Sequence, residues 1–180
     1  MPARLLLDND FILKISTLDL IEEFTSLPFV RDSELRHIKA LHFMIAKGKF
    51  GDYPPEGLQR AQSWISTFPY VEAVDPVFHD RIPLTPGIDT GEKLLLADLL
   101  QHVESSVFTG DKRCITAIGG FSAELREAFS GRILCLEAAV RAIVARYDFD
   151  RVAGKVRQGL CCDTAIRIVF GCAGPADYAL

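Results

Sequence analysis

Near its start the chain runs through three consecutive leucines, Leu5–Leu7, and then places two carboxylates, Asp8 and Asp10, within the next three residues. A short apolar run that ends in polar residues is typical of a strand buried on both faces, as in a parallel sheet. Charge at the end of such a run must be solvated, ion-paired or bound to a cation, because burying it uncompensated is unfavourable. This stretch therefore constrains both the fold and the place of a candidate site.

The rest of the chain alternates between short apolar segments and longer segments with helical periodicity. Strands are predicted over Arg4–Leu7, Ser106–Thr109 and Arg132–Cys135. Helices are predicted over Thr17–Thr25, Ser33–Lys47, Glu56–Thr67, Thr90–Val103, from Lys112, over Ser122–Phe129, 136–147 and 150–170. Residues 75–91, which are interrupted by prolines and glycines, are expected to be irregular. This alternation indicates a three-layer α/β fold, with a central, mostly parallel sheet of about four to five strands flanked by helices.

Length and charge bound the other possibilities. The chain of 180 residues is expected to form one domain, 1–180, with a helical C-terminal extension over about 136–180. Its apolar stretches fall short of the roughly 20 residues that span a bilayer, and its start lacks the signal-peptide pattern, so we expect a cytoplasmic protein without a membrane partner. The net charge of −4, without a long basic run, argues against nucleic-acid binding through a broad basic surface. It leaves open an enzyme that neutralises phosphates with metal ions held by its own carboxylates.

Acidic residues stand at three places that this fold is expected to bring together. Asp8 and Asp10 follow the first strand, Glu92 lies at the start of the helix in "DTGEKLLLADLL", and Asp111 follows a strand in "VFTGDKR". Functional groups of parallel sheets gather at the carboxyl ends of the strands. Carboxylate oxygens are preferred ligands of Mg²⁺ and Mn²⁺, which lower the pKa of bound water and stabilise charge on a phosphate. The sequence therefore predicts a divalent metal site.

Each of these acids also has a local structural explanation. The stretch from Asp8 to Asp10 fits a polar turn after a strand. Asp89 and Glu92 fit a capping box, and Asp111 fits a turn and helix N-cap. These explanations account for each stretch separately but not for the order in which the stretches occur, so the combination favours a site.

The order of these motifs resembles that of the PIN domain, a nuclease fold. That family opens with a strand that ends in Asp, carries an acid on a later helix, and has a Thr-x-Asp-like turn after a following strand. The resemblance covers residues 4–12 and 88–119, and it is greatest to PIN-like domains whose helix begins with Gly-Glu.

The resemblance implies a metal-dependent ribonuclease that hydrolyses phosphodiester bonds of single-stranded RNA. Asp8, Glu92 and Asp111 are then the catalytic acids, and they hold one or two Mg²⁺ or Mn²⁺ ions. Asp10 stands where the family commonly has Asn, Ser or Thr, and it is expected either to bind the metal or to orient a ligand.

The sequence offers further candidate site residues without deciding their roles. Lys112 and Arg113 are candidates for contacting a substrate phosphate, and a solvated helix start is the alternative. Their positive charge is unfavourable at a helix N-terminus, which favours the functional role. The family usually has one more acid on a helix before the Gly-Glu region; Glu34 and Glu72 are both available, and the sequence does not decide between them.

Two other functions compete with the nuclease. "LLLDND" also fits the opening of a haloacid-dehalogenase-like phosphatase, with Asp8 as nucleophile and Asp10 as general acid and base. Against it, Ile12 replaces the usual Thr or Val, and "GDKRCI" lacks the second acid of that family's later motif. The third possibility is a degenerate nuclease-like module that binds a partner without cutting. Expected partners are RNA, an inhibitory antitoxin-like protein and a second copy of the chain. The second copy would pack on the apolar stripe of residues 35–45 and on the apolar C-terminal region, for which a buried core face is the alternative.

Overall fold

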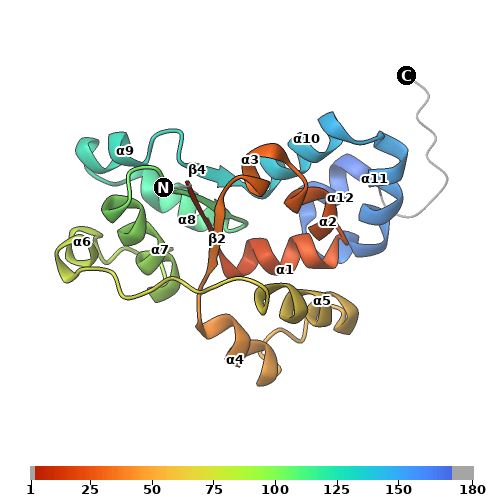
Figure 1. Ribbon diagram of the computed structural model, residues 1–180, viewed down its shortest axis with the longest axis horizontal. Helices are drawn as coiled ribbons and strands as arrows, with labels where there is room; N and C mark the ends of the chain where they lie inside the picture. The colour runs from red at the N-terminus through yellow and green to blue at the C-terminus, as the bar shows by residue number, and fades with distance from the viewer. Residues whose placement is uncertain (1–2, 172–180) are drawn as a thin grey trace.

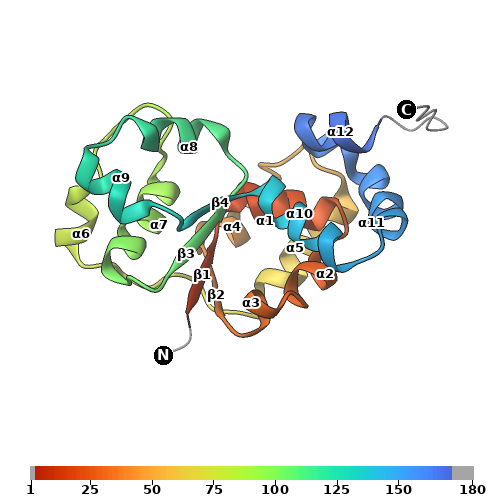
Figure 2. The same ribbon diagram turned by 90° about the horizontal axis from the view of Figure 1, so that it is seen from above.

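The computed structural model describes residues 3–171, apart from the side chains of residues 160 and 161 (Figures 1 and 2). At the centre of this part of the chain lies a sheet of four parallel strands in the order β2-β1-β3-β4. The strands are β1 (Arg4–Leu7), β2 (Glu34–His37), β3 (Ser106–Thr109) and β4 (Ile133–Cys135). The predicted fold class, a three-layer α/β fold around a parallel sheet, is confirmed.

Helices connect the strands and follow the last of them. They are α1 (Asn9–Thr17), α2 (Ile21–Thr25), α3 (Pro28–Arg31), α4 (Ala40–Ala46), α5 (Pro55–Ile65), α6 (Pro76–Arg81), α7 (Thr90–Gln101), α8 (Lys112–Gly119), α9 (Ala123–Phe129), α10 (Leu136–Arg146), α11 (Phe149–Val156), the 3₁₀ segment η1 (Arg157–Cys162) and α12 (Thr164–Phe170).

Alternate residues of the central strands point to opposite faces of the sheet, so the strands build two cores. Leu5, Leu7 and Phe108 pack with helices α1–α3, α5 and α10–α12. Leu6 and Val107 face the other way and pack with α7, α8 and α9. Figure 2 shows these two sets of helices on either side of the sheet. Burial on both faces explains why β1 reads as an uninterrupted apolar run.

Three buried aromatic rings fix α1 against β3. The Phe11 ring lies 4.9 Å from that of Phe108 and 5.1 Å from that of Phe24, measured between centroids. Phe24 and Phe108 are 5.3 Å apart and nearly perpendicular, a favourable arrangement for aromatic pairs. This packing sets the start of α1 beside the end of β3.

The helix predicted over Ser33–Lys47 is wrong in its first half. Glu34–His37 forms the edge strand β2, in parallel register with Arg4–Leu7, and the helix begins only at α4. Ser33 does not cap that helix; its hydroxyl donates to the Phe29 carbonyl at 2.6 Å. The helix-like spacing of the apolar residues is overridden here by pairing with β1, a tertiary effect that local periodicity does not contain.

Two other segments differ from expectation. The helix predicted over Thr17–Thr25 is present only over Ile21–Thr25. Thr17 is instead the last residue of α1, a helix that was not predicted from the sequence. Helix α1 buries residues around most of its circumference, so it lacks the polar stripe that marks a surface helix. The irregular stretch 75–91 contains α6, and the helix predicted over 150–170 is divided by η1. The other predicted helices and strands are found to within a few residues.

The apolar stripe of residues 35–45 packs inside the chain. Ile38 and Leu41 are buried in the two cores, and Leu35 and Ile45 pack against one of them. This favours the core explanation of the stripe, and the homodimer stays a prediction. Helices α10–α12 of the expected C-terminal extension share the core of α1, while residues 172–180 lie outside the described part. No helix within residues 3–171 combines the length and apolar character that a membrane crossing requires.

Candidate active site

The candidate site lies at the carboxyl edge of the sheet, where strands end and helices begin. β1 passes directly into α1 with Asp8 as N-cap, and β3 leads to α8 with Asp111 as N-cap. Helix α7 begins with a complete capping box between Asp89 and Glu92. The local explanations for Glu92 and Asp111 are therefore confirmed, and they coexist with the convergence that a site requires.

Asp8 and Glu92 are buried side by side around one small cavity. Their exposed fractions are 5% and 7%, and they line a space of about 10 Å³ together with Thr109 and Cys114. The Thr109 hydroxyl donates to Asp8 Oδ2 at 3.1 Å. A space of this size is about that of one water molecule. Leu95, Leu96, Val107, Ile118 and Ile133 also line this space, so the two inner carboxylates lie beside a small and largely apolar cavity.

The inner carboxylates accept hydrogen bonds but have no cationic partner among the described residues: the Asn9 N–H donates to Asp8 at 2.7 Å, and the Asp89 N–H donates to Glu92 at 2.7 Å. Burial, with the charges of Glu92 and Asp10 in addition, raises the pKa of Asp8 to about 7. Burial also raises the pKa of Glu92, and the charges of Asp89 and Asp111 contribute. Within residues 3–171, neither Asp8 nor Glu92 forms an ion pair with Lys, Arg or His. Two adjacent buried acids without a cation are unfavourable when ionised, so this pocket would gain from a bound cation or from protons.

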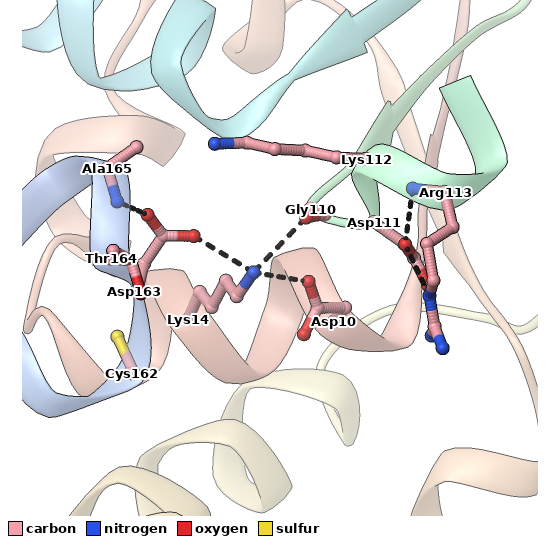
Figure 3. A pocket seen from close by; sticks show the side chains of 10 residues that line it. All are labelled: Asp10, Lys14, Gly110, Asp111, Lys112, Arg113, Cys162, Asp163, Thr164 and Ala165. Atoms are coloured by element: carbon pink, nitrogen blue, oxygen red, sulfur yellow. Dashed lines mark hydrogen bonds and ion pairs between the residues drawn. The ribbon is translucent and has the colours of Figure 1, made fainter. Parts of the chain in front are cut away.

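An open pocket of about 360 Å³ adjoins this region, and Lys14 lies at its centre (Figure 3). The Lys14 ammonium is 2.6 Å from Asp10 Oδ2 and 3.0 Å from Asp163 Oδ2, and it donates to the Gly110 carbonyl at 3.1 Å. Burial disfavours the charged form, but the hydrogen bonds and charges of the two acids outweigh it and raise the pKa of Lys14. Lys14 thereby ties α1, the end of β3 and the start of α12 together.

Asp10 is held from two sides. Its Oδ1 accepts a 2.9 Å hydrogen bond from the Tyr53 hydroxyl, and its Oδ2 binds Lys14. Burial and the charge of Asp10 raise the pKa of Tyr53, so the hydroxyl stays a donor. Gly110 packs so closely that a Cβ at this position would collide with the Asp10 carboxylate. A larger residue at Gly110 would therefore displace the Asp10 carboxylate from its place beside Lys14.

The two predicted phosphate-binding residues stand at the rim of the open pocket. Arg113 binds Asp111 at 2.6 Å, and this hydrogen bond lowers the pKa of Asp111. Lys112 extends across the pocket to Glu137 at 3.0 Å. The side chains of Lys112 and Arg113 are 61% and 84% exposed, so both remain accessible to a solute. Contact with a phosphate stays a prediction.

Neither candidate for the additional acid joins this group. Glu34 begins β2 at the opposite edge of the sheet and binds Arg36 at 2.6 Å. Glu72 is exposed and lies 3.7 Å from the same guanidinium. The acid that the sequence analysis missed is Asp163, the N-cap of α12, which is 9% exposed and bound to Lys14. An Asp before an apolar helix signals a cap, but nothing local indicates that α12 returns to α1.

The donor set fits a hard divalent cation in its chemistry, because it consists of carboxylate oxygens of which the inner two lack a cation. Within the described part of the chain, no group of three or more Asp, Glu, His or Cys side chains stands ready to hold an ion. The outer acids, Asp10 and Asp111, are occupied by Lys14 and Arg113. Full metal coordination therefore requires these two acids to turn away from the chain's own cations.

Comparisons of the chain with protein-family models, with curated proteins and with solved structures find no match.

The raised pKa of Asp8 predicts a pH-dependent stability. Between pH about 4 and about 7, native Asp8 keeps a proton that the unfolded chain has lost. The free energy of unfolding therefore falls as pH rises through this window, by up to about 1.4 kcal/mol per pH unit from this group. Asp8→Asn removes the effect, so in EDTA the variant should be more stable than the wild type above pH about 7 and equal to it near pH about 4. Urea denaturation across this range measures the difference, and a difference independent of pH contradicts the prediction.

The Lys14 contacts predict a large cost for removing the ammonium. Lys14→Met leaves Asp10 and Asp163 facing each other without a cation and should lower the free energy of unfolding by about 3 kcal/mol. Adding Asp163→Asn should restore part of the loss, because one of the unpaired charges disappears. Lys112→Met, which removes an exposed lysine from the same pocket, is the matched control and should change stability by about 1 kcal/mol or less. Equal losses for the two lysines would show that Lys14 has no special role.

Proposed function

We propose that the protein is a metal-dependent nuclease that hydrolyses phosphodiester bonds of single-stranded RNA. The observation that carries the proposal is the inner carboxylate pair, Asp8 and Glu92, which is buried in one cavity without any cation among the described residues. Buried carboxylates with raised pKa values and no cationic partner mark a candidate site for metal binding or proton transfer.

The surrounding charges support a site that acts on a phosphate ester. Asp10 and Asp111 add negative charge beside the inner pair, and Lys14, Lys112 and Arg113 place positive charge around the open pocket. Acids that hold a metal and cations that meet a phosphate are both needed for phosphodiester hydrolysis. The pocket of about 360 Å³ is open to solvent, and the exposed side chains of Lys112 and Arg113 are among those that line it.

The proposed roles follow from these positions. Asp8, Glu92 and Asp111 would hold Mg²⁺ or Mn²⁺, and Asp10 would join them or orient one of them. When bound, such an ion would supply a water molecule of lowered pKa and positive charge for the phosphate. Thr109 donates to Asp8 and fixes its orientation, while Tyr53 and Lys14 fix Asp10.

The choice of RNA comes from the order of the motifs, which is similar to that of PIN-domain ribonucleases. The haloacid-dehalogenase-like phosphatase and the non-cutting module remain the alternatives. A phosphatase requires Asp8 to attack a phosphomonoester, and the 5% exposure of this side chain is less favourable for a nucleophile than for a metal ligand.

Cleavage of labelled single-stranded RNA tests the proposal. With Mn²⁺ or Mg²⁺ present we expect cutting that EDTA abolishes, because the inner acids need a cation to act. Asp8→Asn and Glu92→Gln should each lower the rate by about 100-fold or more. Asp32→Asn, which changes an exposed acid paired with Arg31, is the matched control and should cut at the wild-type rate.

The alternatives give different results in the same experiment. Release of phosphate from a small phosphomonoester, without RNA cutting, identifies a phosphatase instead. The absence of both activities, with no metal-dependent rise in melting temperature, leaves a binding module. RNA cutting that persists in EDTA or in Asp8→Asn excludes the proposed site.

A further inference from the structure

A separate cavity of about 540 Å³ lies beyond the carboxyl end of β2 and is lined by α4 and the segment after α5. We call it the aromatic groove and define it by His37, Lys39, His42, Phe43, Phe68 and Tyr70. Figure 1 shows α4 continuing from β2 at the end of the sheet from which α1 also departs. The rings of Phe43 and Tyr70 are 56% and 44% exposed. Large rings exposed in a concave surface commonly mark a binding site.

The segment that forms one wall of the groove is basic, although the whole chain is acidic. The chain carries 24 Asp and Glu against 20 Lys and Arg, but residues 35–51 contain Arg36, Lys39, Lys47 and Lys49 and no acid. Arg36 is held by Glu34 and Glu72, whereas the three lysines are exposed, and of these Lys39 lines the groove itself. The described residues that line the groove include no Asp or Glu. An exposed basic segment with aromatic rings is complementary to a phosphate backbone with unstacked bases.

The groove adjoins the candidate active site. His37 pairs with Leu7, the residue before Asp8, on neighbouring strands that lie about 4.8 Å apart. Tyr70 is fixed beside His37 by a β-bridge. The residue between His37 and Lys39, Ile38, packs against the start of α7. A Cβ on Gly91, next to Glu92, would lie 2.8 Å from Ile38 Cδ1.

We propose that the aromatic groove stacks unpaired bases of single-stranded RNA and thereby guides the strand into the acid site. The proposal rests on the nuclease function proposed above and adds the feature by which the substrate is recognised. Tyr70 and Phe43 supply the stacking surfaces. The Lys39 ammonium lies over one face of the Tyr70 ring, 4.9 Å from its centroid, so Lys39 swings off that face to contact the phosphate when a base stacks there. Stacking on aromatic rings is tolerant of sequence and selects single strands over duplexes.

Binding measured in EDTA tests the groove independently of cutting. A short labelled single-stranded RNA is titrated with the protein, and its fluorescence anisotropy gives the affinity. Tyr70→Ala should weaken binding roughly 5- to 150-fold, as expected for loss of stacking on one base, whereas Tyr70→Phe should bind as the wild type. Lys39→Glu should weaken binding and reduce the dependence of the affinity on salt concentration. Tyr70→Ala should leave that salt dependence unchanged.

Matched variants elsewhere control for nonspecific effects. Phe149→Ala removes a ring of similar exposure on α11, and Arg126→Glu makes the same change of charge on α9. Both should bind RNA with wild-type affinity, and a duplex RNA of the same sequence should bind more weakly than the single strand. Unchanged binding in Tyr70→Ala and Phe43→Ala, equal loss in Phe149→Ala, or equal affinity for the duplex overturns the groove.

The two proposals fail in distinguishable ways. If wild-type protein cuts RNA with metal while the groove variants bind and cut normally, the groove is excluded and the nuclease stands. If binding depends on the groove but no cutting occurs with Mg²⁺ or Mn²⁺, the nuclease is excluded and an RNA-binding module remains. If the wild type binds no RNA with or without metal, the groove inference is overturned.

Discussion

Uncompensated negative charge at the carboxyl edge of the sheet is the constraint on which the proposed function depends. Asp8 and Glu92 line one small cavity, and within residues 3–171 Lys14 and Arg113 pair with the acids around them rather than with these two. This arrangement destabilises the protein at neutral pH, where the inner pair tends to ionise. Sites that lower stability in this way are expected where a ligand, here a divalent cation, offsets the charge.

The same acids have a structural role as helix caps. Asp8, Asp111 and Asp163 cap α1, α8 and α12, and Glu92 completes the capping box of α7. Helices α1 and α8 follow strands of the parallel sheet and therefore begin at its carboxyl edge, whereas the starts of α7 and α12 are brought there by packing. Helix N-termini also favour negative charge, which partly stabilises the cluster. Local capping and a shared site are therefore compatible consequences of one topology.

The sequence predicts the parts of this arrangement that depend on local pattern. The apolar runs of β1 and β3, the start of α7 and the positions of Asp8, Glu92 and Asp111 follow from residue types and spacing. It does not predict β2, because that strand exists only through its pairing with β1. Nor does it place Asp163, since the contact with Lys14 depends on how the C-terminal helices pack.

Binding of a divalent cation by the inner acids is tested most directly by calorimetric titration with Mn²⁺ in buffers of different ionisation enthalpy. Asp8 has a pKa of about 7, so its coordination to metal should release a proton near pH 6 (about one unit below that pKa) and almost none about two units higher. We expect the wild type to bind Mn²⁺ with this pH-dependent proton release, and we expect Asp8→Asn to lose both the binding and the proton release. Undetectable binding, or binding that is the same in Asp8→Asn, would contradict this expectation.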